Sequence, residues 1–136
     1  EVIDCFATDH APHTMTEKES DDPPPGFPGV ETMLPLLLDQ VNRGHLTLEQ
    51  LVERLDTNPR RIFGLPPADT TVEVDPDAEW VIRAAELHTG CDWTPFEGRR
   101  LTGRVTTVRR GDEILYDQGK VLATPGSGVD LRKGKR

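Results

Sequence analysis

The hydrophobic period of this chain changes from helical to alternating near residue 70, and that change limits the folds available to it. Before it, apolar residues recur at helical spacing over residues 30–41 and 48–55, which predicts helices with one buried stripe. After it, apolar and polar residues alternate or form short β-branched runs, which predicts strands. The candidate strands are residues 71–75, 79–82, 103–109, 114–116 and 120–122. We therefore expect helices followed by an all-strand section that forms part of a small sheet domain.

Local signals mark where several of these elements begin and end. Thr47, with a glutamine three residues later, forms a capping-box pattern that predicts a helix start. Asn58 and Pro59 predict a second start, with asparagine as the cap and proline in the first turn, and Gly64 predicts its end. Residues 117–119, which finish on glycine, predict a hairpin turn between the last two strands.

Chemistry-bearing residues gather at the end of the first apolar run, residues 2–7. This short, partly β-branched run predicts a buried strand, and Asp9 follows it directly. Pro12 keeps the chain from turning straight into a helix, so His10 and His13 are expected on a loop. A carboxylate at the end of a strand with imidazoles beyond it can bind a metal, move a proton or hold an anion.

Each of these residue types also has an ordinary structural role. A lone aspartate after a strand is most often a turn residue or a cap, and it is the two following histidines and the rigid loop that favour a site. His10 is expected to pack, or else to orient its neighbours. His45 and His88 lie in polar contexts typical of the surface, and Trp80 and Trp93 are candidates for the core or a domain interface.

A long polar loop, residues 14–22, leads into a proline-rich stretch, residues 23–29. Such a stretch has extended and turn geometry with little regular hydrogen bonding. Loops of this length are usually functional or disordered. Three consecutive prolines lower the entropy lost on ordering, which favours a functional loop.

Composition excludes several classes of protein. The net charge of −8 disfavours a nucleic-acid or anionic-membrane surface, and the short basic tail, residues 131–136, is expected to be solvated. No apolar stretch approaches the ~20 residues that span a bilayer. Cys5 and Cys91 lie far apart in unlike contexts, which predicts no disulfide and a reducing, cytoplasmic location. The chain opens on Glu1 within a predicted strand, so we expect a fragment of a longer enzyme.

Four motifs together resemble the carboxyl-terminal part of dihydroorotase, in the amidohydrolase superfamily, and most of all the dihydroorotase domain of fused pyrimidine-synthesis enzymes. The motif at residues 7–13 is shared by related ring-opening hydrolases, and the proline stretch running into Glu31-Thr32-Met33-Leu34-Pro35 narrows the resemblance. The matching segments are residues 7–13, 23–35, 58–65 and 93–98, followed by the hairpin, so the resemblance covers nearly the whole chain.

The resemblance implies an α/β fold built on a metal-dependent β/α barrel, or TIM barrel. Residues 1–68 would supply the last barrel strand (residues 2–8), the active-site loop and terminal helices. Residues 69–136 would supply part of a small β-sandwich and the carboxyl-terminal tail. Sites in such barrels lie on the loops that follow the strands.

The implied activity is the reversible, zinc-dependent interconversion of N-carbamoyl-L-aspartate and L-dihydroorotate in pyrimidine biosynthesis. Asp9 matches the aspartate that ligates one of two zinc ions and relays a proton. His13 matches a histidine that contacts the substrate carboxylate, and Pro25 and Gly26 match loop residues whose main chain bonds the pyrimidine ring. A carboxylate is suited to both roles of Asp9, and glycine permits close approach of backbone to ligand.

The family's other ligands, a His-x-His pair, a carboxylated lysine and two further histidines, have no counterpart in this sequence. We therefore expect the chain alone to be inactive and the longer protein to be a homo-oligomer or part of a multienzyme chain. Two alternatives stay open: another cyclic-amide hydrolase such as a hydantoinase or allantoinase, and a non-catalytic dihydroorotase-like scaffold domain. His13 and the proline stretch favour dihydroorotase over the first, and Asp9 and His13 argue against the second.

Overall fold

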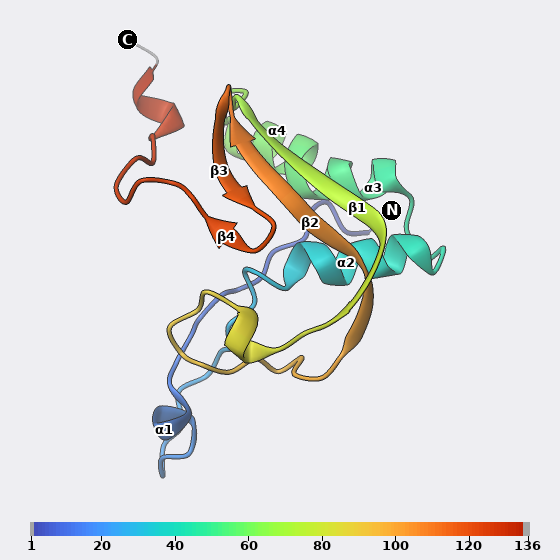
Figure 1. Ribbon diagram of the computed structural model, residues 1–136. Coiled ribbons are helices and arrows are strands. Elements are labelled where there is room, and N and C mark those ends of the chain that lie inside the picture. Colours follow the sequence, from blue (N-terminus) through green and yellow to red (C-terminus); the bar gives the residue numbers. More distant parts are fainter. Residues whose placement is uncertain (1, 135–136) are drawn as a thin grey trace.

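The computed structural model describes residues 2–134, and its elements run from helices to a sheet (Figure 1). In chain order they are α1 (Met15–Lys18), α2 (Met33–Asn42), α3 (Leu48–Val52), the π-helical η1 (Glu53–Thr57), α4 (Asn58–Phe63), β1 (Thr70–Val81), the 3-10 turn η2 (Ala84–Glu86), β2 (Arg100–Arg110), β3 (Glu113–Asp117), β4 (Lys120–Val121) and the 3-10 turn η3 (Leu131–Gly134). The predicted change from helix to strand near residue 70 is confirmed. Lys135 and Arg136, the end of the basic tail, lie outside the described residues. None of the helices between residues 2 and 134 is long and apolar enough to span a bilayer.

The sheet is antiparallel, with its strands in chain order β1-β2-β3-β4. The two strands predicted at residues 71–75 and 79–82 are one long strand, β1, interrupted by a shift in register between Asp75 and Glu79. Pro76 lies in that interval and has no N–H to donate to a ladder. The Asp75 carboxylate instead accepts a hydrogen bond from the Asp77 N–H, at 3.0 Å. The interruption in the pattern is therefore a bulge, and β1 continues through it.

The hairpin between β3 and β4 has the predicted turn. Gln118 and Gly119 both have positive φ, at 45° and 88°, as a two-residue turn with the twist of a hairpin requires. Asp117 pairs with Lys120 and Tyr116 with Val121 across it. The prediction from residues 117–119 is confirmed.

The core lies where α2 packs on β2, behind the long strands in Figure 1. Leu38 of α2 and Leu101 of β2 are 3% and 1% exposed. Gly103 has φ +106° and lies against Leu38, so closely that a Cβ there would be 2.7 Å from the Leu38 Cβ. Beside this contact the buried Asp39 carboxylate accepts hydrogen bonds from the Arg43 Nε at 2.7 Å and from the Thr102 N–H at 3.2 Å. Helix and sheet are joined by packing and by this buried carboxylate.

From residue 48 to residue 63 the chain is helical throughout. The Thr47 capping box and the end at Gly64, which has φ +62°, are confirmed. Asn58 is not a cap, so that prediction is wrong: its backbone is helical, and its side-chain Nδ2 donates to the Asp4 carbonyl at 2.8 Å. Pro59, the second residue of α4, has no N–H to donate to the preceding turn, and the wider π-helical turn η1 ends two residues before it, at Thr57.

Residues 2–8 do not form the predicted strand. The last barrel strand of the expected fold is therefore not present in this structure. Residues 2–9 have no regular secondary structure, and Val2 is 98% exposed. The segment lies along the helices, with the Phe6 N–H donating to the Arg54 carbonyl at 3.2 Å. A strand exists only where neighbouring strands pair with it, and within residues 2–134 the strands β1 to β4 pair only with one another. The division at residues 68/69 stays a prediction; it falls in the connection between α4 and β1.

Candidate functional site

Asp9 has an unusual backbone conformation at the head of the motif loop, residues 8–13. Its φ is +47°, in the left-handed region that aspartate tolerates better than most residues. The Thr8 hydroxyl accepts a hydrogen bond from the His10 N–H at 3.2 Å and spans this turn. The Asp9 side chain is exposed, and within residues 2–134 its carboxylate has no hydrogen bond or ion pair. It is therefore open to a ligand.

His10 joins the motif loop to the end of the proline loop, residues 23–29. Its Nδ1 accepts hydrogen bonds from the backbone N–H groups of Gly29 and Val30, at 3.0 and 3.3 Å. An adjacent backbone bond, from the Ala11 N–H to the Phe27 carbonyl at 3.1 Å, runs beside it. Of the two expectations for His10, packing is wrong, since the residue is exposed, and orienting its neighbours is what it does.

Lys18 orders the proline loop from the inside. Its Nζ donates to the carbonyls of Pro24 and Gly26, at 2.6 and 3.0 Å. Lys18 is held in place by α1, a single helical turn whose capping box joins Thr14 and Glu17. We predicted no helix inside this loop, although the Thr-x-x-Glu pattern was available in the sequence as its signal.

The peptide unit between Pro25 and Gly26 is left without a partner by this arrangement. Among the described residues neither the Pro25 carbonyl nor the Gly26 N–H makes a hydrogen bond, although carbonyls on both sides are occupied by Lys18. Gly26 has φ +103°, and a Cβ there would be 2.5 Å from the Ala11 Cβ. Glycine is thus required for the proline loop to lie against the motif loop, whatever contact it makes with a ligand.

His13 is half-buried and is held by its backbone. Its carbonyl accepts a hydrogen bond from the Trp93 Nε1 at 2.6 Å, which confirms Trp93 as a contact between the two sections of the chain. The His13 ring has no hydrogen-bond partner among the described residues. Next to it, hydrogen bonds from the Thr14 N–H and hydroxyl lower the pKa of the Glu17 carboxyl.

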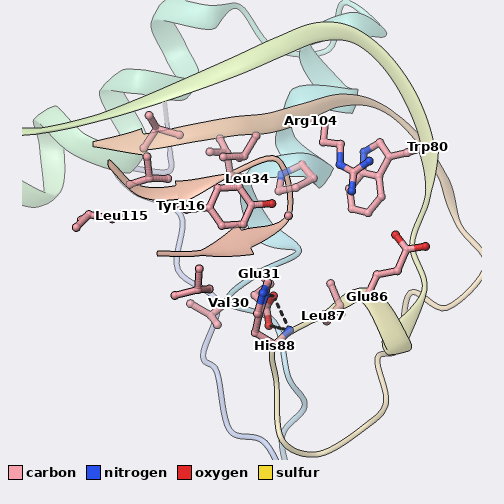
Figure 2. Close-up of a pocket in the computed structure, with 16 residues that line it drawn as sticks. Val30, Glu31, Leu34, Trp80, Glu86, Leu87, His88, Arg104, Leu115 and Tyr116 are labelled. Carbon is pink, nitrogen blue, oxygen red and sulfur yellow. Dashed lines mark hydrogen bonds and ion pairs between the residues drawn. The ribbon is translucent and has the colours of Figure 1, made fainter. Parts of the chain in front are cut away.

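Glu31 and His88 form a contact that the sequence did not indicate. The His88 N–H lies 2.9 Å from both Glu31 carboxylate oxygens, and the ring Nδ1 lies 3.0 Å from Oε2. This pair borders two hollows. One is a groove of about 410 Å³ whose lining includes His10, His13, Glu17, Glu31, His88 and Cys91. The other is a mostly apolar pocket of about 510 Å³ between α2 and the sheet face, with Leu34, Trp80 and Tyr116 in its wall (Figure 2).

The structure brings only some of the predicted residues together. The motif loop and the proline loop lie side by side, and His13 lines the groove, whereas Asp9, Pro25 and Gly26 do not. No group of three or more His, Cys, Asp or Glu side chains that could hold a metal occurs within residues 2–134. Within these residues the predicted site groups are therefore not gathered into one assembled site.

Comparison with known proteins finds relatives that match nearly the whole of this chain. No family model matches the chain. The multifunctional protein CAD of Squalus acanthias is 56% identical over 133 residues, which are 97% of this chain and 6% of that protein. The dihydroorotase of Pyrococcus furiosus is 42% identical over 142 residues, covering 98% of this chain and 33% of that enzyme. Over nearly its whole length, this chain is similar to part of these proteins.

The chain is also similar to part of solved structures of a hydantoinase and of a dihydroorotase-like domain. A D-hydantoinase from Thermus sp. matches with a TM-score of 0.87 and 28% identity, over 96% of this chain and 32% of that one. The inactive dihydroorotase-like domain of a Chaetomium thermophilum CAD-like protein matches with a TM-score of 0.67 and 31% identity, over 86% and 33%. The chain thus spans about a third of the archaeal dihydroorotase and of these structures, and a small part of the multifunctional protein.

Proposed function

We propose that the protein containing this chain is a cytoplasmic dihydroorotase, which interconverts N-carbamoyl-L-aspartate and L-dihydroorotate in pyrimidine biosynthesis. One observation carries the proposal. The groups predicted to meet metal and substrate are the Asp9 carboxylate, the His13 ring and the Pro25–Gly26 peptide unit, and all three lack hydrogen-bond partners among the described residues. Their neighbours His10, Lys18 and Trp93 are meanwhile fixed by hydrogen bonds. The 42% identity with the Pyrococcus furiosus dihydroorotase supports it.

The donor set fits one ligand position of a zinc site. An exposed carboxylate without a competing bond is a ligand zinc accepts, and Asp9 would occupy that position. The other ligands of a binuclear site would come from parts of the protein outside this chain. Bound zinc would polarise the ring carbonyl and lower the pKa of water, so that water can give up a proton as it attacks.

Asp9 has a second role in this proposal, because its carboxylate can carry a proton. In the hydrolytic direction it accepts the proton of the attacking water and delivers it to the ring nitrogen as the C–N bond breaks. The reverse reaction removes a proton from the carbamoyl nitrogen and releases water. One carboxylate serves both directions if it stays within hydrogen-bond reach of both atoms.

The remaining groups would bind the substrate. The His13 imidazole donates to the substrate carboxylate, and the Pro25 carbonyl and Gly26 N–H bond the pyrimidine ring. Residues 2–8 would become a barrel strand once the upstream strands pair with them, and residues 69–136 would complete a β-sandwich. We propose a multienzyme chain or a homo-oligomer as the setting, the first supported by the multifunctional shark relative.

The test is to assay the full-length protein for zinc and for hydrolysis of dihydroorotate, beside an Asp9→Ala variant. We expect bound zinc in the parent and a loss of about 10²–10⁴-fold in kcat in the variant. Asp22→Ala is the matched control, since Asp22 is an exposed carboxylate in the polar loop without hydrogen bonds to described residues. It should leave the activity unchanged.

Two outcomes would overturn the proposal. Faster hydrolysis of hydantoin or allantoin than of dihydroorotate would make the protein another cyclic-amide hydrolase, an alternative supported by the TM-score of 0.87 with a D-hydantoinase. An inert full-length protein with zinc supplied would make it a scaffold domain, an alternative that the likeness to the inactive Chaetomium domain supports.

A further inference from the structure

The β1–β2 connection, residues 82–99, reaches both loops of the candidate site. In Figure 1 it extends from the lower end of the long strands toward the segment that carries α1. Three of its residues make the contacts. Trp93 donates to the His13 carbonyl at 2.6 Å, Phe96 meets Phe27 edge to face with ring centroids 6.2 Å apart, and His88 bonds Glu31 through its N–H at 2.9 Å.

This connection is firmly anchored at its base. Ile82 is fully buried, and its N–H and carbonyl bond the Arg99 carbonyl and the Gly98 N–H, both at 2.9 Å. A second contact joins the two ends of the connection: the Glu97 carboxylate accepts a hydrogen bond from the Ala84 N–H at 2.6 Å. Thr94, next to Trp93, is 6% exposed. The Trp93 indole is therefore carried by a loop whose ends are fixed and whose neighbouring residue is buried.

His13 depends on that indole more than its neighbours do. Ala11 is fixed by a backbone bond to Phe27, and Thr14 by its capping box with Glu17. Between them Pro12 has no N–H, and among the described residues the bond to Trp93 is the single hydrogen bond of His13. A loop residue with one fixed point keeps its orientation only while that point holds.

We propose that Trp93 is a positioning residue, whose Nε1–H holds the His13 backbone so that its ring meets the substrate carboxylate; this rests on the proposed dihydroorotase function. Trp93 touches no reacting atom. Trp93 acts through His13, so its loss should change substrate binding more than turnover. The sheet section thereby contributes to a site whose other groups precede it in the chain.

The test uses Trp93→Phe in the full-length protein, which removes the N–H and keeps most of the ring. We expect KM for dihydroorotate to rise about three- to tenfold, the loss of one hydrogen bond, with kcat within about twofold. Hydrogen exchange of residues 8–14 should accelerate in the same variant. Trp80→Phe is the matched control, because the Trp80 Nε1 also donates to a carbonyl, that of Gly103 at 3.0 Å, within the sheet. It should change neither readout.

A double variant separates positioning from a general structural effect. In a His13→Ala background, Trp93→Phe should leave KM where His13→Ala alone puts it, since the two act on one contact. A full additional rise in KM there, or an unchanged KM in Trp93→Phe alone, overturns the proposal. If the full-length protein neither binds nor hydrolyses dihydroorotate, the proposed function fails by itself. The exchange readout then decides: acceleration confined to residues 8–14 supports the Trp93 contact, and no acceleration overturns it.

Discussion

The sheet and the segment before α2 are organised by different kinds of contact. Strands β1 to β4 are held by a ladder of backbone pairs that lies wholly inside the chain. Residues 2–31 contain one isolated bridge, between His10 and Phe27, and are otherwise fixed at separate points by side chains such as Lys18 and Trp93. The ladder survives the loss of one bond, whereas a loop held at few points does not. Stability and site geometry should therefore respond to different substitutions.

The strongest test of this difference uses two glycines with nearly the same φ. Gly103→Ala places a Cβ 2.7 Å from Leu38 in the buried α2–β2 contact, at φ +106°. We expect the free energy of opening of the sheet to fall by about 2–4 kcal/mol, from overpacking and backbone strain. Hydrogen exchange of the sheet amides in the full-length protein measures it.

Gly26→Ala is the counterpart in the proline loop, with φ +103° and a Cβ 2.5 Å from the Ala11 Cβ. It should move that loop and impair dihydroorotate binding while sheet exchange stays as in the parent. Equal losses of sheet stability in the two variants would show that the loops and the sheet unfold as one unit.

A smaller effect is expected at the buried carboxylate that joins helix to sheet. Asp39→Ala leaves the Thr102 N–H and the Arg43 guanidinium without their acceptor. Because the carboxylate is buried and the Thr102 N–H is half-buried, losing this contact should cost about 1–3 kcal/mol, which should appear as faster exchange in α2 and β2 together. Asp39→Asn keeps an acceptor oxygen and should lose less. If it loses as much, the negative charge of Asp39 is what matters.

In the loops, Lys18→Met should act on binding and leave the sheet alone. The ammonium that fixes the Pro24 and Gly26 carbonyls is removed and its apolar stem is kept. We expect KM for dihydroorotate to rise about three- to fivefold, with sheet exchange unchanged. Lys120→Met, at the exposed strand β4, is the control and should leave KM unaltered. An unaltered KM in Lys18→Met would mean that the prolines alone order the loop.

The smallest effects should come from the two capping boxes. Thr47→Ala removes a cap from a helix that continues to Phe63 and buries Leu51, and should cost about 1 kcal/mol of helix stability. Thr14→Ala affects only α1, which has no buried residue, and should change local exchange at residues 14–18 alone. A loss of sheet stability from Thr14→Ala would contradict the separation of the two regions.

The α1 cap should also depend on pH. Hydrogen bonds from Thr14 lower the pKa of Glu17, so its carboxylate stabilises the turn at pH values above the ordinary carboxyl pKa. This contribution is lost as the pH falls through the lowered pKa of Glu17. An NMR titration of residues 14–17 would follow it.

Features with short-range causes could be predicted from the sequence. The Thr47 box, the stop at Gly64 and the turn at residues 118–119 depend on residues within one turn of each other. A strand at residues 2–8 would need neighbouring strands to pair with. The apolar pattern of these residues does not show whether such strands are present. The cap expected at Asn58 failed because the chain is already helical there: η1 ends at Thr57 and α4 begins at Asn58.

The same distinction holds at the site. The motif and proline loops could be recognised from local residues, and the structure places them side by side. The contacts that fix them could not be recognised: Trp93 meets His13 across 80 positions, and His88 meets Glu31 across 57. Neither pair shares a pattern or period. The roles of Asp9, His13, Pro25 and Gly26 stay predictions until the full-length protein is assayed.

The closed base of the β1–β2 connection has a consequence for how such proteins diversify. Because Ile82 pairs with Gly98 and Arg99, the residues between them form a long loop whose two ends are fixed. Insertions, deletions and drift inside it leave the register of β1 with β2 intact. Natural variation can therefore reshape the contacts that Trp93, Phe96 and His88 make without jeopardising the scaffold. Proteins that share this sheet could acquire new substrate preferences through changes in the β1–β2 connection alone.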